Sequence, residues 1–314
     1  MQEEIIQLIE EFLKAARRPL IVILGPTSAG KTQLSLDLAS RFSGEIISAD
    51  SRQVYRHMDI GTDKIPIEKR KNIPHHLIDV VNPDERFTVA DYKRMTEKTI
   101  DEILEKSHTP FLVGGSGLYI RAVTQNFTLL PESKDLELRK KLTNELETEG
   151  KQKLHEKLMK LDPESAKKIH PNNIPYLLRA LEIVLLTGKP KSVALQQKED
   201  SQTHHEATRY DILKIGLNLP RETLYRRIED RVDAQIKNGL VEETKKLLEN
   251  YLPHFTSMRT LGYQEIALYL QNKISLETAI ALIKQHTRHF AKRQMTWWRQ
   301  EADIHWFTLL QSPS

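Results

Sequence analysis

Residues 20–32 read Leu-Ile-Val-Ile-Leu-Gly-Pro-Thr-Ser-Ala-Gly-Lys-Thr, an apolar run followed by the pattern GxxxxGK(S/T). The run between Pro19 and Gly25 is typical of a strand that is buried on both faces. After Thr32, apolar and polar residues interleave in a way that predicts a helix. A strand, a glycine-containing loop and a helix in this order are the context that a P-loop requires. Residues 25–32 therefore predict a P-loop, around which the fold is organised.

This P-loop predicts a site for an oligophosphate. Its glycines let the backbone curl around an anion without Cβ clashes, so that successive N–H groups and a helix N-terminus face the ligand. Lys31 adds a positive charge, and the Thr32 hydroxyl can bind Mg²⁺. The motif does not say which oligophosphate is bound. The expected phosphate-binding residues are Gly25, Pro26, Thr27, Ser28, Ala29, Gly30, Lys31 and Thr32, with Thr32 as the metal ligand.

The composition narrows the class of protein. With 39% hydrophobic and 29% charged residues, the chain reads as a soluble globular protein. No stretch reaches the ~18 apolar residues of a membrane span, and the acidic, amphipathic start predicts no secretory signal. The absence of cysteine excludes disulfides, cysteine-based zinc sites and thiol catalysis. The net charge of +4 permits a nucleic-acid partner without requiring one. We expect a cytoplasmic monomer without membrane contact.

The rest of the chain predicts an α/β fold with a helical insertion. Short apolar runs at 45–49, 75–81 and 109–113 alternate with helical patterns, which indicates a parallel sheet with crossover helices. Near Pro131 the sequence pattern changes to charged helical segments that are interrupted by Pro and Gly. The alternation of apolar and polar residues that is typical of a strand returns at 212–219. We therefore predict a P-loop NTPase-like parallel sheet flanked by helices. Its expected parts are a core over 1–130, an all-helical insertion over 131–203, and a second core part over 204–314.

Asp50 follows the second predicted strand and is the first candidate for chemistry outside the P-loop. Ligands of open α/β sheets sit at the carboxyl ends of strands, so Asp50 is expected beside the P-loop. Its carboxylate could be a metal ligand, a general base or a helix N-cap. A second glycine-rich strand end, Gly114–Tyr119, could bring backbone and the Ser116 hydroxyl against a ligand. It could equally be an ordinary strand-to-helix turn.

The helical stretch 278–300 contains no acidic residue, and Lys284, Arg288, Lys292 and Arg299 fall on roughly one stripe, which Arg293 accompanies. Histidines and the pair Trp297 and Trp298 accompany these cations. Basic side chains interleaved with aromatic ones suit a phosphate backbone and stacked bases. The alternative is a helix whose aromatic residues face the core while its charges are solvated.

From these features alone, three activities stay open. A P-loop kinase or NTPase would use Asp50 for magnesium and arginines for the transferred phosphoryl group. A nucleic-acid-binding NTPase would suit the basic helix. A group transferase could use the P-loop to hold a diphosphate as its leaving group.

Several motifs in one order resemble a known family. These motifs are Gly25–Thr32, Asp50–Arg56 with Met58–Thr62, Gly114–Tyr119, His170–Asn172 with Arg179–Glu182, Arg259–Ile266 and Lys292–Trp297. Together they resemble the bacterial tRNA dimethylallyltransferase (tRNA isopentenyltransferase) family along nearly the whole chain. The resemblance implies transfer of a dimethylallyl group from dimethylallyl diphosphate to N6 of adenine 37, in tRNAs that read codons beginning with U. It also implies that the helical insertion helps to grip the anticodon stem-loop, and that the adenine is flipped into a channel. A P-loop small-molecule or nucleotide kinase is the alternative.

The resemblance also implies roles for individual residues. Asp50 would accept a hydrogen bond from the adenine amine, while Lys31, the P-loop amides and Mg²⁺ on Thr32 would stabilise the departing diphosphate. Thr27 and Ser28 would add hydroxyl donors, Arg231 would contact the diphosphate, and Ser116, where the family usually has Thr, would contact the target nucleotide. Contacts with tRNA are expected at Asp50, Ser51, Arg52, Gln53, Ser116, Arg139, Arg179, Arg259, Gly262, Tyr263, Gln264, Arg288, Lys292 and Arg293.

One segment departs from the family pattern. The family often carries Gln-Arg ahead of the run Arg179–Glu182, where this chain has Ile-Pro-Tyr-Leu-Leu at 174–178. Of the implied tRNA contact in this segment, only Arg179 is left.

Overall fold

The computed structural model describes residues 1–125, 136–190, 209–252, 257–301 and 303–309. The chain divides into two compact units: Met1–Phe127 together with Arg209–Ser314, and Thr128–Thr208. Among the residues described, none of the helices is both long enough and apolar enough to cross a membrane.

The first unit is built on a parallel sheet of six strands. Its order is β3-β2-β4-β1-β5-β6, and every neighbouring pair is parallel. The central β1 carries the P-loop at its carboxyl end, as a parallel α/β sheet requires for a ligand site. The bounds are β1 Pro19–Leu24, β2 Gly44–Ala49, β3 His75–His76, β4 Thr109–Gly114, β5 Asp211–Asn218 and β6 Ile304–Thr308.

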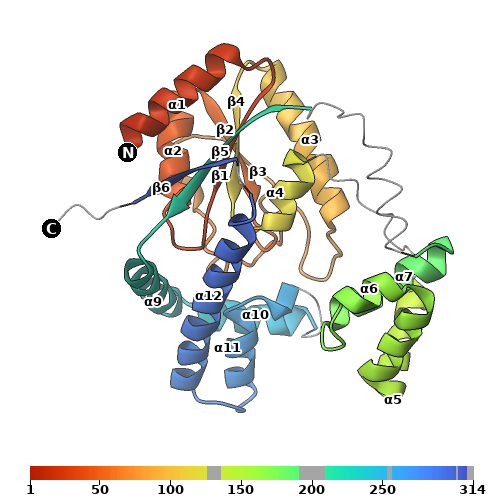
Figure 1. Ribbon diagram of the computed structural model, residues 1–314. Coiled ribbons are helices and arrows are strands. Elements are labelled where there is room, and N and C mark those ends of the chain that lie inside the picture. Colours follow the sequence, from red (N-terminus) through yellow and green to blue (C-terminus); the bar gives the residue numbers. More distant parts are fainter. Residues whose placement is uncertain (126–135, 191–208, 253–256, 302, 310–314) are drawn as a thin grey trace. The chain divides into compact units, whose positions relative to one another are not determined.

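Helices cover both faces of this sheet (Figure 1). Leu20, Val22 and Leu24 of β1 pack with α3 (Val89–Glu105) and α4 (Gly117–Thr124). The intervening Ile21 and Ile23 pack on the opposite face with α1 (Gln2–Ala15) and α2 (Lys31–Arg41). Because successive strand side chains point to opposite faces, an unbroken apolar run fills two cores at once. This double burial fixes β1, and with it the start of the P-loop.

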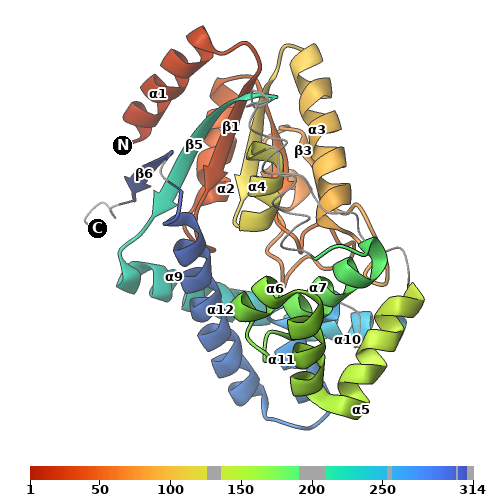
Figure 2. The same cartoon turned by 45° about the vertical axis from the view of Figure 1, so that its right-hand side comes forward.

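Further helices lie at the end of the sheet where β1 and β5 finish (Figures 1 and 2). α9 follows β5 directly, and α12 leads back toward the edge strand β6. These helices are the source of the long-range contacts with the P-loop described below. Their bounds are α9 Arg221–Lys237, α10 Leu240–Asn250, α11 Tyr263–Leu270 and α12 Leu276–Trp298, with short 3₁₀ helices at Ile67–Lys69 and Ser257–Arg259.

The described part of the second unit is helical. It comprises α5 (Leu136–Leu161), α6 (Pro163–Lys168) and α7 (Ile174–Thr187), and Gly150 breaks α5 with a left-handed φ of 83°. Leucines at 142, 154, 158, 177 and 181 form a core that belongs to this unit alone. Residues 131–135 and 191–203 of the predicted insertion lie outside the described residues.

Two strands differ from the sequence prediction. Of the strand expected over 75–81, only His75 and His76 pair with β2, because Leu77 and Asp79 adopt left-handed φ values of 58° and 57° that end it; Val81 forms an isolated bridge with Tyr55. β6 was not predicted. It is a five-residue strand at the edge of the sheet in which only Ile304 is buried, and His305 interrupts its apolar residues.

Candidate active site

Two glycines shape the P-loop. Gly25 has a φ of 145°, and a Cβ at this position would lie 2.5 Å from the Leu217 carbonyl oxygen on β5. Gly30 lies directly before α2 with a φ of 91°, a backbone conformation that residues with a side chain rarely adopt. The loop therefore passes close to β5 and leads directly into the N-terminus of α2, and a helix N-terminus after such a loop is a site where backbone N–H groups bind phosphate.

The loop carries two polar side chains that suit an anion, Ser28 and Lys31. The Ser28 hydroxyl is buried and has no hydrogen-bond partner among the described residues. Lys31 Nζ donates to the Pro26 carbonyl oxygen at 2.6 Å, which folds the ammonium back over the loop. Burial lowers the pKa of Lys31 to about 8, an effect that the charge of Asp50 opposes and that of Arg231 reinforces. A bound anion would supply both the partner for Ser28 and the negative charge for Lys31.

Arg231 reaches the P-loop from α9. One of its terminal nitrogens donates to Thr27 Oγ1 at 2.7 Å and lies 3.3 Å from Asp63. Since the threonine oxygen accepts this bond, its own hydrogen is left to be donated elsewhere. Arg227, one turn earlier, also approaches the loop: its guanidinium lies 3.7 Å from where a Cβ on Gly30 would be. Of these two arginines, only Arg231 was predicted from the sequence. Arg227 is one of three arginines within 226–231, and no local pattern distinguishes it from the others.

Asp50 and Ser116 lie together where β2 and β4 end side by side. Asp50 Oδ1 accepts the backbone N–H of Arg52 at 2.8 Å, and Ser116 Oγ accepts that of Ser51 at 3.0 Å. Asp50 is half-buried, and residues 51–54 form turns, so the helix N-cap interpretation of Asp50 is wrong. Gln53 is turned toward the protein, where its side chain bonds Ser48 and the Thr62 carbonyl. A carboxylate and a hydroxyl thus flank the strand ends next to the P-loop.

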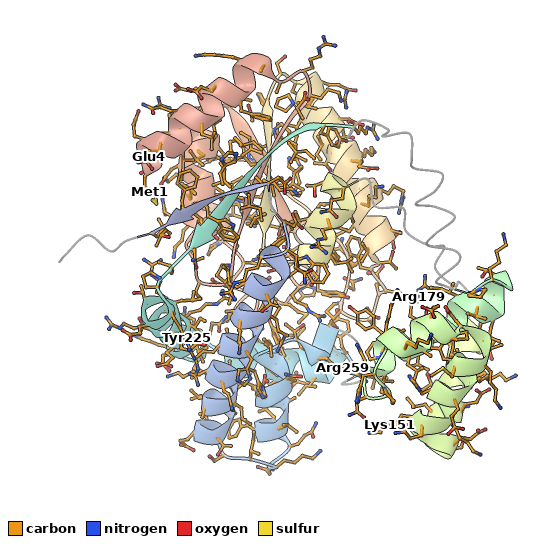
Figure 3. All side chains as sticks on the ribbon, in the orientation of Figure 1. Met1, Glu4, Lys151, Arg179, Tyr225 and Arg259 are labelled. Atoms are coloured by element: carbon orange, nitrogen blue, oxygen red, sulfur yellow. The ribbon has the colours of Figure 1, made fainter. Side chains whose placement is uncertain are left out.

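The segment 259–264 is held by two carboxylates, the buried Glu265 and the half-buried Glu243. Glu265 accepts the Gly262 N–H at 2.8 Å and the Gln264 amide at 2.7 Å. Tyr263 is fully buried, and its hydroxyl donates to Glu243 at 2.6 Å, so its side chain supports the segment from inside. Arg259, labelled in Figure 3, is exposed ahead of α11. Of the four expected contact residues here, Arg259 is the one whose side chain is fully open to solvent.

The basic residues of α12 differ in their surroundings: some form ion pairs within the protein and others are exposed. Arg288 forms an ion pair with Glu229 of α9 at 2.7 Å and stacks near Tyr225, which Figure 3 labels. Lys292 and Arg293 are exposed. Trp298 is fully buried, and Trp297 lies under the Arg121 guanidinium at 4.6 Å. The tryptophans therefore face the core, whereas Lys292 and Arg299 of the stripe, and Arg293 beside it, are exposed.

In the helical unit, Arg139 and Arg179 converge on one carboxylate. Arg139 of α5 lies 2.6 Å and Arg179 of α7 lies 3.4 Å from the buried Glu182. Figure 3 labels Arg179 on α7. The two arginines expected to contact tRNA thus lie side by side in this unit.

Gln294 is a site residue that the sequence did not reveal. It lies on α12 and is 7% exposed, yet its side chain contacts both the P-loop and the glycine-rich turn after β4. The available signal was a polar residue within the buried stripe of a helix, between Ala291 and Trp298.

Comparison with known proteins decides the family. A family model described as IPP transferase matches residues 53–301. The chain belongs to this family. A tRNA dimethylallyltransferase of Moorella thermoacetica is 45% identical over 298 residues, covering 93% of this chain and 90% of the relative. A tRNA dimethylallyltransferase of Halothermothrix orenii is 47% identical over 292 residues, covering 92% and 87%.

Solved structures of this family share the fold. A full-length tRNA isopentenylpyrophosphate transferase of Bacillus halodurans superposes with a TM-score of 0.68 at 43% identity, covering 93% of this chain and 90% of that one. A eukaryotic dimethylallyltransferase acting on tRNA gives a TM-score of 0.77 at 30% identity, covering 93% and 74%. The predicted P-loop NTPase-like fold is therefore confirmed, and the kinase alternative is not favoured.

Proposed function

We propose that this chain transfers the dimethylallyl group of dimethylallyl diphosphate to N6 of adenine 37 in the anticodon loop of tRNAs that read codons beginning with U. The products are N6-dimethylallyladenosine and diphosphate. One observation carries the proposal: a P-loop and a carboxylate lie at the same end of the sheet. The P-loop has a buried Ser28 hydroxyl without a partner among the described residues, and the carboxylate is that of Asp50. Membership of the IPP transferase family supports it.

The donor's diphosphate would lie on the P-loop. The amides of Gly30 to Thr32 and the Lys31 ammonium would bind its oxygens, and the Ser28 hydroxyl, which has no partner among the described residues, would gain one. Arg231 donates to Thr27 Oγ1, which leaves the threonine hydrogen to be donated to the diphosphate oxygen on which charge grows as the C1–O bond breaks. These groups stabilise the leaving group more than the bound donor, which is what lowers a barrier.

Thr32 suits the proposed Mg²⁺. Its side chain is exposed in the first turn of α2, directly after Lys31, so that a hydroxyl oxygen is available beside the phosphate cradle. Mg²⁺ prefers oxygen ligands and commonly combines a few protein oxygens with substrate phosphates. When bound, the ion would neutralise part of the diphosphate charge.

Asp50 would act on the acceptor. The N6 lone pair of adenine is delocalised into the ring, so the amine is a weak nucleophile. A carboxylate that accepts its hydrogen bond, and then its proton as the N6–C1 bond forms, would favour attack. The Ser116 hydroxyl, which accepts the Ser51 N–H, retains a hydrogen to donate to the flipped nucleotide.

The tRNA would be bound by cations of both units. Exposed Arg259, Lys292 and Arg293 of the first unit suit phosphates of the anticodon stem-loop, and Arg139 and Arg179 of the helical unit suit further contacts. We further propose that the protein works as a cytoplasmic monomer.

The test is to incubate the purified protein with unmodified tRNA and either dimethylallyl diphosphate or ATP. The proposal expects a prenylated adenosine with the first donor and no phosphoryl transfer with the second. Phosphoryl transfer from ATP without any prenylated nucleoside would contradict it and favour a kinase.

A further inference from the structure

Gln294 is a buried polar side chain with two partners that are far away in the sequence. It sits in the apolar stripe of α12 with Ala291 and Trp298, where an amide must find hydrogen bonds to be tolerated. Both ends of the amide are used, because Oε1 accepts the Thr27 N–H at 2.9 Å and Nε2 donates to the Gly115 carbonyl oxygen at 2.9 Å. This pairing fixes which end of the amide faces which loop.

The backbone on one side is adapted to this contact. A Cβ on Gly115 would lie 2.2 Å from Gln294 Nε2, so a glycine is needed for the close approach. On the other side, Thr27 is held twice, by Gln294 at its amide and by Arg231 at its hydroxyl. The Thr27 amide is therefore already used within the protein.

The two loops that Gln294 joins have different tasks in the proposed reaction. Thr27 belongs to the loop proposed to hold the diphosphate, and Gly115 precedes Ser116, which contacts the turn that carries Asp50. We propose that Gln294 is a positioning residue for prenyl transfer, which fixes the spacing between the loop that holds the donor and the loop that faces the nucleotide. This inference rests on the proposed function.

The proposal predicts an effect on the chemical step. The residues that would bind each substrate are all retained when Gln294 is shortened, but the spacing between their two loops is no longer fixed. A misplacement of about 1 Å can cost about a hundredfold in rate. Gln294→Ala should therefore lower kcat about a hundredfold, with the donor KM and the tRNA Kd within about threefold of the parent.

A nearly isosteric variant gives a readout that loss of packing would not give. In Gln294→Glu, one carboxylate oxygen can still accept the Thr27 N–H, but the other faces the Gly115 carbonyl oxygen and repels it. Protonation restores a donor to Gly115, and burial next to a carbonyl raises the pKa of such a carboxyl. The ratio of variant to parent kcat should therefore rise as the pH is lowered from about 8 to about 6, whereas the ratio for Gln294→Ala should stay flat.

The matched control is Gln285→Ala, which removes an exposed glutamine from the same helix and should leave kcat unchanged. Thermal unfolding and tRNA binding of each variant check that it is folded. An unchanged kcat in Gln294→Ala, or a Gln294→Glu ratio that does not vary with pH, would overturn the proposal. If Gln294→Ala does not fold, the pH dependence of Gln294→Glu decides alone. Absence of prenylated adenosine with the parent protein would instead refute the proposed function itself.

Discussion

We predict that Lys31 makes the binding of the proposed donor sensitive to pH in a range where lysines ordinarily do not titrate. Burial lowers the pKa of its ammonium to about 8, despite the nearby charge of Asp50. A lysine with a lowered pKa loses its charge as the pH rises through that value. The diphosphate needs this charge, so its affinity for the free protein should fall above about pH 8.

The size of the effect follows from the titration. With a pKa of about 8, the charged fraction of Lys31 drops from about nine-tenths at pH 7 to about one-tenth at pH 9. If only the charged form binds, the donor Kd weakens about tenfold between these two pH values. A lysine with the ordinary pKa of about 10.4 would stay almost fully charged over the same range and give almost no change.

The assay is calorimetric titration of dimethylallyl diphosphate into the protein with Mg²⁺ at both pH values. Lys31→Arg is the matched control, because a guanidinium keeps its charge throughout and reports any pH effect of the ligand itself. Lys31→Ala should bind the donor weakly at both pH values while tRNA affinity is retained. The reasoning is refuted if the parent binds equally well at both pH values, or if Lys31→Arg shows the same slope.

Three further predictions concern the acceptor side and the fold. Asp50→Ala should abolish prenyl transfer while tRNA binding, measured by filter retention, largely remains; parental turnover would remove Asp50 from the mechanism. Lys292→Ala combined with Arg293→Ala should reduce the slope of log K for tRNA against log salt by up to about 1.8, and an unchanged slope would show that these cations are only solvated. Glu243→Gln should lower the free energy of unfolding by about 1.5–3 kcal/mol, because its carboxylate accepts three consecutive backbone N–H groups at 59–61 and the Tyr263 hydroxyl. Urea unfolding would measure this loss, and a parental midpoint would contradict it.

The features that could be predicted from the sequence are those that neighbouring residues determine. The strand before the P-loop is buried on both faces, so residues 20–24 are all apolar, and this run predicts the strand. The glycines of the loop are needed for its own backbone. Asp50 could be expected beside the P-loop because parallel strands end at the same edge of the sheet.

The features that were missed depend on partners far away along the chain. Gln294 is 267 residues from Thr27, and Glu243 is 183 residues from Ile60, so no local pattern links either pair. The basic stripe was visible, but the pairing of Arg288 with Glu229 on another helix was not. β6 depends on its register with β5 and carries too little apolar sequence of its own.

The central claim is that the P-loop holds the diphosphate of a prenyl donor while Asp50 accepts a hydrogen bond from the adenine amine that attacks it. Its most direct test is to prenylate unmodified tRNA with the purified protein and to map the modified nucleoside by mass spectrometry of the digested anticodon loop. The account predicts one dimethylallyl group on N6 of adenine 37, with one diphosphate released for each group transferred. A tRNA without any prenyl group under these conditions, or a prenyl group at another base, would contradict it.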